Sequence, residues 1–315
     1  MKTLFRISDF GLRISNFCNS VFQIPSITIS LFLVYLFCSI LTAQVFSEED
    51  VEICNAKFQL AVNKNLAEKP MGDIIVEVGK SFIGTDYLSH SLEKDGDEEL
   101  VINLTGLDCT TFFENSLVLA RCIKKGKTSF EDYMNELQLI RYRDGVINEY
   151  PSRLHYFSDW IYDNVKKGIV EDVTEEIGGK KISFNLNFMT THPDSYIQLK
   201  SRQGGTDFIP IIKEQEKEIG CREYYFIPKE ELESKEQLIN NGDLIAITTT
   251  VEGLDIGHIG IAVRMDDGKI HLLHAPTENT KVQITDQSLS DYLMKYKRHS
   301  GVIVLRVLEP SNLPD

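Results

Sequence analysis

The residues whose types and spacing could do chemistry are one cysteine and two histidines, Cys109, His258 and His274. A thiolate is a strong nucleophile, and an imidazole can take the thiol proton and return it to a leaving group. Cys109 follows Asp108, a residue type that caps helices, at the start of a predicted helix. Unpaired backbone N–H groups and the helix dipole favour a thiolate there, which predicts a pKa below the ordinary value of about 8.5.

The predicted helix spans about residues 107–122, and its pattern places Cys109 on the buried face. Apolar and small residues follow the cysteine at helical offsets of 3, 4, 7, 8 and 11, namely Phe112, Phe113, Ser116, Leu117 and Ala120. The alternative for a cysteine in such a position is simple packing, because free cysteine is among the most buried residue types.

The strand around His258 changes the balance between these two interpretations. His258, Gly260 and Ala262 share one face of this strand, while isoleucine and valine side chains occupy the other face. Glycine and alanine beside the histidine leave room for the end of a helix to approach. We therefore expect the cysteine helix to pack on the His258 face, with the opposite face in the ordinary core.

The next strand can be aligned with this one from the turn between them. Asp266-Asp267-Gly268 suits a three-residue hairpin loop in which glycine adopts the left-handed conformation. Counting outward pairs Val263 with His271 and Gly260 with His274, so His274 is a diagonal neighbour of His258, at about 7–8 Å between backbones. A two-residue turn would instead place His274 opposite Ile261, on the other face. The role of His274 as a residue that orients His258 depends on this register.

The remaining histidines fit no catalytic or metal-binding pattern. His271 would lie roughly 17–20 Å along the strand from His258, so we interpret it as a strand histidine with a structural role. His90, His155, His192 and His299 have no metal-ligand spacing with each other or with a cysteine pair. We expect no cofactor and no metal, although a metal site built from Cys109, His258 and His274 stays an alternative.

The elements that must position these residues form an α+β pattern. Two helices are predicted between residues 48 and 80, interrupted at Pro70 and Gly72, and a polar loop at about 89–99 precedes the cysteine helix. Strands follow residue 242, at 243–249, 257–265, 269–275, 281–284 and 302–308, with a helix near 289–295. Helices first and an antiparallel sheet later indicate one domain from 44 to 315, with a long central insertion at about 125–235.

The N-terminal segment has the layout of an export signal. Residues 14–47 carry no charge, and an apolar run at 27–41 follows Lys2, Arg6 and Arg13. Residues 1–43 are therefore predicted to be a signal peptide, or alternatively a retained N-terminal anchor. We expect a protein of the periplasm or cell envelope, with no stable membrane insertion if the signal is cleaved.

Charge and cysteine content limit the partners and the cross-links. Residues 1–43 hold three basic residues and one acidic residue, so their removal takes the formal charge from −14 to −16. Such a surface repels nucleic acid. A shared helix would separate Cys109 from Cys122 by about 20 Å, so any disulfide would join Cys54, Cys122 or Cys221 and leave Cys109 free.

Several sequence blocks resemble one family of cysteine hydrolases. The blocks are FIGTDY at 82–87, GLDCTTFFEN at 106–115, GDLIAITT at 242–249, GLDIGHIGIAV at 253–263 and LLHAP at 272–276. In this order they resemble the NlpC-type papain-like cysteine peptidases. IRYRDGVI at 140–147 and SRLHYFSDWIYDN at 152–164 resemble, more narrowly, the N-acetylmuramoyl-L-alanine amidase-like branch.

The resemblance implies a papain-like fold and a set of roles. Cys109 is the implied nucleophile, His258 the general base and His274 the residue that orients it. Threonine follows Cys109 twice where many relatives have Ser-Gly, a departure that affects the start of the helix. The implied reaction is hydrolysis of an amide bond in cell-wall muropeptides, in which the thiolate attacks a carbonyl and water then cleaves the thioester.

The same blocks supply candidates for substrate binding. Muropeptides carry carboxylates, which an acidic protein must meet with local cations, and Arg141, Arg143 and Arg153 are the candidates. Each of them could instead form a structural ion pair. Tyr87 and Asp108 are further candidates beside the cysteine.

Three functions remain open from the sequence. The first is an N-acetylmuramoyl-L-alanine amidase that acts on muropeptides or 1,6-anhydro-muropeptides in muropeptide recycling. The second is a D-glutamyl-diaminopimelate endopeptidase that uses the same residues. The third is a noncatalytic muropeptide-binding protein, which would need no nucleophile.

Overall fold

The computed structural model describes residues 44–94, 96–196, 199, 207–277 and 280–310. The chain divides into two units, Met1–Ala43 and Gln44–Asp315. The predicted signal peptide or anchor at 1–43 therefore lies outside the described residues. Within these residues, no helix is both long and apolar enough to span a bilayer.

Two helices begin the second unit, as the sequence predicts. Helix α2 (Glu48–Asn63) starts at a capping box in which Ser47 and Asp50 satisfy each other's backbone N–H groups. Helix α3 (Met71–Lys80) begins directly after Pro70, whose ring is tolerated at a helix start but not inside a helix. A short 3₁₀ turn, η1 (Leu66–Glu68), joins the two helices.

Helix α4 (Cys109–Lys125) carries the candidate nucleophile at its first position. It ends at Gly126, which adopts φ 68°, a left-handed conformation that glycine reaches at little cost. The sequence pattern predicts one buried face, yet every residue from 111 to 123 is buried. The polar side of α4 is covered by the next helix along the chain, whose Arg141 and Glu136 pair with Glu114 and Arg121 of α4.

The central segment adds helices and also strands. Its helices are α5 (Phe130–Arg141), α6 (Phe157–Lys166), α7 (Phe188–Thr191), α8 (Ile209–Gly220) and α9 (Lys229–Leu232). Its short 3₁₀ turns are η2 (Arg143–Gly145), η3 (Tyr150–Ser152) and η4 (Pro193–Ser195), and η5 (Glu236–Leu238) follows α9. Its strands are β3 (Val170–Asp172), β4 (Lys180–Ile182) and β5 (Tyr224–Pro228). These strands join the main sheet, so the central segment completes the same domain.

The C-terminal part forms the centre of the main sheet. Its strands are β6 (Leu244–Thr249), β7 (Ile256–Arg264), β8 (Ile270–His274), β9 (Gln283–Ile284) and β10 (His299–Val307), and helix α10 (Leu289–Lys295) precedes β10. The strand order is β4-β5-β10-β6-β7-β8-β9, with β3 also paired to β10, and every pairing in this sheet is antiparallel. The predicted α+β class with an antiparallel sheet is therefore confirmed.

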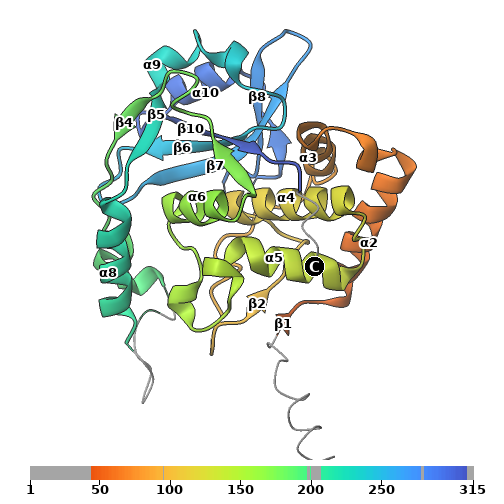
Figure 1. The fold of residues 1–315 in the computed structure, drawn as a ribbon, viewed down its shortest axis with the longest axis horizontal. Helices are drawn as coiled ribbons and strands as arrows, with labels where there is room; N and C mark the ends of the chain where they lie inside the picture. Colours follow the sequence, from red (N-terminus) through yellow and green to blue (C-terminus); the bar gives the residue numbers. More distant parts are fainter. Residues whose placement is uncertain (1–43, 95, 197–198, 200–206, 278–279, 311–315) are drawn as a thin grey trace, which may run out of the picture. The chain divides into compact units, whose positions relative to one another are not determined.

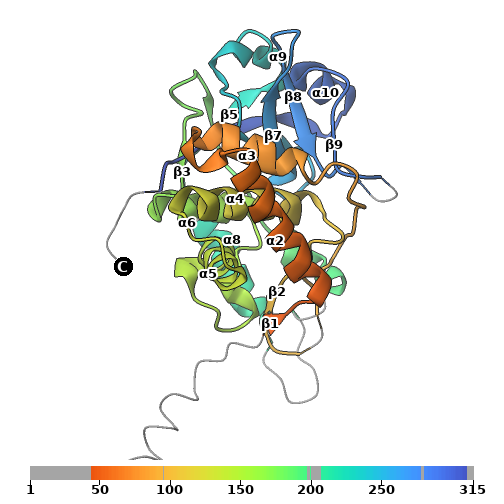
Figure 2. The same cartoon turned by 90° about the vertical axis from the view of Figure 1, so that its right-hand side faces the viewer.

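Two hydrophobic cores lie on the two faces of the main sheet. The larger core joins helices α2 to α6 to Ile259, Ile261 and Val263 of β7. The smaller core joins Ala262 of β7 to α9 and α10. Figure 1 shows α4 between the sheet and α5, with α9 and α10 beyond the other face. Figure 2 shows α2 and α3 beside α4, and a small parallel pair, β1 (Gln44–Val45) with β2 (Leu100–Val101), lies near the start of α2.

Candidate active site

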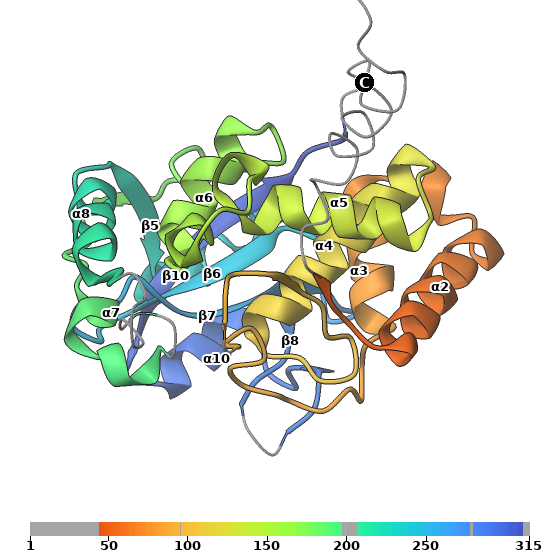
Figure 3. The same ribbon diagram turned by 90° about the horizontal axis from the view of Figure 1, so that it is seen from below.

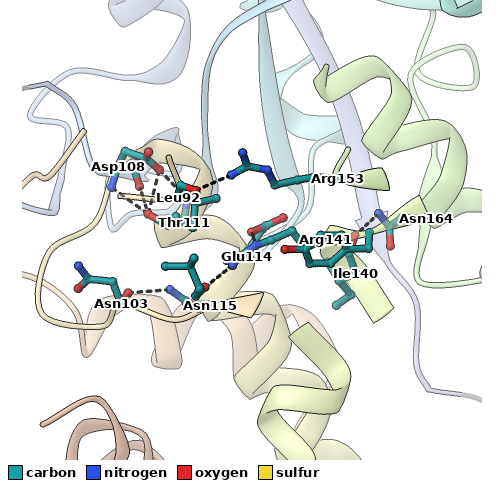
Figure 4. Close-up of polar contacts among 12 residues, drawn as sticks. Leu92, Asn103, Asp108, Thr111, Glu114, Asn115, Ile140, Arg141, Arg153 and Asn164 are labelled. Carbon is teal, nitrogen blue, oxygen red and sulfur yellow. Dashed lines mark hydrogen bonds and ion pairs between the residues drawn. The ribbon is translucent and has the colours of Figure 1, made fainter. Parts of the chain in front are cut away.

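The N-terminus of α4 is fixed by a reciprocal cap around Asp108. The Asp108 carboxylate accepts a hydrogen bond from the Thr111 backbone N–H at 2.8 Å, and the Thr111 hydroxyl accepts one from the Asp108 N–H at 2.9 Å (Figure 4). The predicted N-cap at Asp108 is confirmed. Threonine at 111 thus closes the cap that begins the helix, and Cys109 is held in its first turn.

The segment at 84–88 braces the loop that leads into α4. Its backbone bonds to the α4 side through Leu107, whose N–H donates to the Asp86 carbonyl at 3.0 Å. It bonds to the β8–β9 side through the Tyr87 N–H, which donates to the Thr280 carbonyl at 3.0 Å. Gly106 allows the close approach, because a Cβ there would lie 2.8 Å from the Cβ of Leu88. This segment therefore ties the cysteine helix to the loop that follows His274.

The β7–β8 hairpin has the predicted three-residue loop and register. Gly268 adopts φ +78°, and the Met265 N–H donates to the Lys269 carbonyl at 3.0 Å. Val263 is paired with His271, as counted from the turn. His258 Nε2 and His274 Nδ1 lie 2.6 Å apart, in hydrogen-bonding contact. The prediction that His274 lies within reach of His258 is confirmed.

The face of β7 on which α4 packs is the reverse of the predicted one. Helices α3 and α4 contact the Ile259, Ile261 and Val263 face, and α10 covers the face of Gly260 and Ala262. A Cβ at Gly260 would lie 2.7 Å from the side chain of Leu272 on the neighbouring strand. The glycine thus makes room for a cross-strand leucine and not for the cysteine helix.

Cys109 nevertheless reaches the backbone next to His258. Its thiol shares a hydrogen bond with the backbone of Ile259, the residue that follows His258. Burial, and then the Asp108 carboxylate, raise the pKa of the Cys109 thiol to about 12, against the opposing effect of hydrogen bonds to Thr110 and Ile259. The sequence predicts a lowered pKa from the helix N-terminus, so this expectation is wrong in direction. Desolvation of the thiolate and the charge of Asp108 outweigh the hydrogen bonds that favour the thiolate.

Both histidines are held in the neutral form. Burial, followed by the neighbouring His274 and His299, keeps the pKa of His258 well below its usual range. Burial lowers the pKa of His274 to about 4. The free protein therefore holds Cys109 as a thiol and His258 as a neutral imidazole. An imidazole that is already neutral is able to accept the thiol proton.

His271 has the structural role that its position predicts. Its Nδ1 lies 2.7 Å from the Thr285 carbonyl oxygen, and its Nε2 lies 3.1 Å from the Asp267 carboxylate. Both ring nitrogens are therefore occupied within the hairpin and its neighbour. His271 takes no part in the His258–His274 contact.

Two of the predicted substrate-binding arginines form buried ion pairs. Arg141 Nε lies 2.8 Å from a Glu114 carboxylate oxygen, and both side chains are almost fully buried (Figure 4). Arg153 pairs with Glu93 at 2.6 Å and with Glu98 at 3.3 Å. Their charges are thus already compensated, as in the alternative interpretation of structural ion pairs.

Four of the five substrate-binding candidates still line one hollow beside the cysteine. This hollow, which we call the Asp108 hollow, has a volume of about 260 Å³, and Tyr87, Asp108, Arg141 and Arg153 are among its lining residues. Thr110 also lines it, so the residues on both sides of Cys109 contribute. Arg143 lies elsewhere, in a bidentate ion pair with Asp159, which also pairs with Arg222.

Comparison with known proteins identifies the family of this chain. The family described as "AmiA-like: N-acetylmuramoyl-L-alanine amidase-like" matches residues 77–302. A protein of Bacteroides uniformis, solved as an N-acetylmuramoyl-L-alanine amidase, is 35% identical with a TM-score of 0.69, over 76% of this chain and 99% of its own. The chain belongs to the N-acetylmuramoyl-L-alanine amidase-like family.

Other solved structures are similar to this amidase-like protein. A Bacteroides fragilis protein, solved under the name of a xylanase, is 40% identical with a TM-score of 0.67, over 73% of this chain and 98% of its own. A Legionella pneumophila protein at 24% identity has a TM-score of 0.61, over 83% of this chain and 97% of its own, and shares the fold. Among curated proteins, none matches the chain.

Two aromatic residues at the site of the amidase-like protein were not found from the sequence. Tyr292 of α10 packs edge-on against His274, with ring centroids 5.4 Å apart, and also contacts His299 at 5.7 Å. Cys109 is among the groups that act on the Tyr292 hydroxyl, whose pKa is raised by burial first. α10 and β10 therefore contribute to the site. Tyr292 and His299 belong to no sequence motif. They come near His274 only through the packing of α10 and β10, which the sequence pattern does not reveal.

Neither a metal cluster nor a disulfide is found in the part of the chain that the structure describes. No group of three or more histidine, cysteine or acidic side chains is placed to hold a metal ion among these residues. The four cysteines beyond residue 43 are free thiols in this structure, with Cys54 and Cys122 buried and Cys221 exposed.

Proposed function

We propose that this protein is a cysteine-dependent amidase of the papain-like, NlpC-type fold that cleaves the bond between the muramoyl lactyl group and L-alanine in peptidoglycan fragments. The observation that carries the proposal is the chain of contacts from Cys109 through the Ile259 backbone to the His258–His274 pair. Membership of the amidase-like family supports the substrate class. A cysteine at a helix N-terminus beside a histidine strand supports the papain-like fold.

The neutral pair defines how the proton moves. Because His258 Nε2 contacts His274, the nitrogen left to serve as base is Nδ1. As the Cys109 sulfur attacks the carbonyl carbon, His258 takes the thiol proton, and the sulfur–carbon bond forms. His258 then gives this proton to the nitrogen as the carbon–nitrogen bond breaks, which releases the amine. Water, deprotonated by His258, hydrolyses the thioester and restores the thiol.

The negative oxygen formed during attack needs a donor at the helix start. In the first turn of α4, Asp108 accepts hydrogen bonds from the backbone N–H groups of Thr111 and Phe112. The Cys109 backbone N–H is the donor that we assign to the oxyanion, because it lies at the N-terminus of α4 beside the attacking sulfur. Removing one such donor commonly costs about 10²–10³-fold in rate.

We also propose that the protein acts outside the cytoplasm. Residues 1–43 have the composition of an export signal or N-terminal anchor, and peptidoglycan fragments are found in the cell envelope. Release of peptides from muropeptides, or from their 1,6-anhydro forms, would serve muropeptide recycling.

The name of the Bacteroides fragilis relative raises glycoside hydrolysis as another reaction. Glycosidases use two carboxyl groups that flank the scissile bond. In the Asp108 hollow, Glu93 and Glu114 are held in ion pairs with Arg153 and Arg141. Carboxylates compensated in this way are poorly suited to acid–base work on a sugar, so the hollow favours amide chemistry at Cys109.

The test is the identity of the products from a defined substrate. We expect the protein to convert a muramyl tripeptide, or its 1,6-anhydro form, into the intact tripeptide with a free L-alanine amine, detected by mass spectrometry. A Cys109→Ala variant is the matched control and should release nothing. Release of muramyl-L-Ala-D-Glu would instead identify a D-glutamyl-diaminopimelate endopeptidase. No product at all, from folded protein with reduced Cys109, would favour a noncatalytic muropeptide-binding protein.

A further inference from the structure

A second cleft opens at the His258–His274 pair. It has a volume of about 340 Å³ and is lined by both histidines of the pair, His258 and His274. Tyr292 and Lys295 of α10 also line it, together with Arg298 from the turn before β10. We call this space the His274 cleft. Figure 3 shows α10 beside β7 and β8, on the side of the sheet away from α5.

The cations at the His274 cleft differ from those at the Asp108 hollow. Lys295 and Arg298 are exposed, and within the described ranges of the chain neither of them forms an ion pair. Arg141, Arg143 and Arg153 are all paired with carboxylates. In a protein with a formal charge of −14, uncompensated cations beside the candidate catalytic histidine favour an anionic ligand.

The charges that face this cleft are mainly positive. Lys229 of α9 lies near enough to act with Arg298 on His299, whose pKa is lowered to about 4 by burial first and by these two cations next. Asp286 is the acidic side chain among the described residues that line the cleft. The local charge is therefore opposite in sign to that of the whole chain.

A buried donor points to the same kind of ligand. If His258 uses Nδ1 as the base, its Nε2 carries a proton and donates it to His274 Nδ1. His274 must then carry its own proton on Nε2, and this atom has no hydrogen-bond partner among the described residues. The His274 side chain is only 1% exposed, so an unpaired N–H on it is costly. His274 lines the cleft, so an oxygen acceptor that reaches its Nε2 would satisfy this donor.

The proposed reaction indicates which part of the substrate binds in the Asp108 hollow and which part binds in the His274 cleft. The acyl group becomes attached to Cys109, and the residues on both sides of Cys109 line the Asp108 hollow. The leaving amine receives its proton from His258, which lines the His274 cleft. The muramoyl part should therefore lie in the hollow and the stem peptide in the cleft.

We propose that the His274 cleft binds a carboxylate of the leaving stem peptide through Lys295 and Arg298, with His274 Nε2–H donating to an oxygen of the same peptide. This proposal rests on the proposed amidase function. It replaces Arg141, Arg143 and Arg153 as the cations that recognise the peptide.

The test measures binding of the product peptide, so it does not depend on turnover. The free tripeptide L-Ala-D-Glu-diaminopimelate is titrated calorimetrically into the Cys109→Ala variant of the full chain. Arg298→Gln and Lys295→Gln in this background should each weaken binding about fivefold, the scale of an exposed ion pair. Lys297→Gln is the matched control, because Lys297 is an exposed cation of the same turn that is absent from the cleft lining.

A second peptide separates charge from shape. The tripeptide with its free carboxylates converted to amides should bind more weakly than the parent and should be insensitive to Arg298→Gln. The proposal would be overturned if Arg298→Gln, Lys295→Gln and the control Lys297→Gln all bound the parent tripeptide with equal affinity. It would also be overturned if the Cys109→Ala protein did not bind this tripeptide at low salt. If the tripeptide binds as expected but no muropeptide is cleaved, the cleft assignment stands and the amidase function fails.

Discussion

His258 Nε2 and His274 Nδ1 lie 2.6 Å apart, which leaves one ring nitrogen of His258 for chemistry. The contact fixes the orientation of the His258 ring, because a hydrogen bond at one nitrogen restricts rotation about the side chain. It also assigns unequal roles to two residues of the same type. His258 precedes Ile259, whose backbone contacts Cys109. His274 is connected to Cys109 through its contact with His258.

The first prediction follows from these unequal roles. His258→Ala should lower turnover by about 10²–10⁴-fold, the usual contribution of a general acid–base group. His274→Ala should leave a measurable remnant, because loss of the orienting residue permits part of the proton transfer. His271→Ala should be nearly silent in turnover, since both of its nitrogens bond within the sheet region. Steady-state kinetics on folded variants checks the order, and a larger effect at His271 than at His274 would contradict it.

The second prediction concerns the acid limb of the pH profile. The proposed mechanism requires a neutral His258, and burial keeps the pKa of this imidazole well below 6.5. As the pH falls, protonation should therefore begin only below the range of an ordinary histidine, which is about 6.5. We expect kcat/KM to stay level as the pH falls from 8 through the ordinary titration range of histidine, and to decline only at lower pH. If kcat/KM were half-maximal at about pH 7, the His258 imidazole would instead take up a proton in the ordinary range of histidine.

The third prediction concerns the reactivity of Cys109 in the free protein. Because its pKa is raised to about 12, alkylation by iodoacetamide should be slow at neutral pH and should rise through pH 9 without a plateau. The exposed Cys221 is replaced by serine so that it does not contribute. The modified residue is identified by peptide mass spectrometry. A plateau between pH 6 and pH 8 would show a stabilised thiolate and would restore the expectation drawn from the helix N-terminus.

Much of the C-terminal half could be predicted from the sequence, because its signals are local. Alternating apolar residues marked the strands, and helix α10 (Leu289–Lys295) lies where it was expected. The Asp266-Asp267-Gly268 loop fixed the register that brings His274 to His258, since a turn type determines which residues pair. The central segment was harder, because strands as short as β3 (Val170–Asp172) carry little pattern of their own.

The packing partners of these elements could not be predicted. The small residues beside His258 suggested that α4 covers their face, yet α10 covers it, because Gly260 and Ala262 leave room for Leu272 and the leucines of α10. The pKa of Cys109 also depends on tertiary burial, which a helix start alone does not reveal. Likewise, the sequence does not reveal that Arg141 pairs with Glu114, so Arg141 was a candidate for binding substrate carboxylates.

The last prediction tests this Arg141–Glu114 pair as a structural element. Both side chains are buried between α4 and α5, and Arg141 also donates to the Val101 carbonyl at 2.5 Å. Arg141→Met should lower the free energy of unfolding by about 3–5 kcal/mol, because it leaves a carboxylate buried without its partner. The double variant Arg141→Met, Glu114→Leu should recover most of this loss, since no charge then stays buried.

The exposed pair of Lys166 and Asp144 is the control, and Lys166→Met should have no measurable effect. Urea unfolding of the single, double and control variants measures these changes in the free energy of unfolding. If Arg141→Met kept full stability but raised KM for the muramyl tripeptide, Arg141 would bind substrate after all.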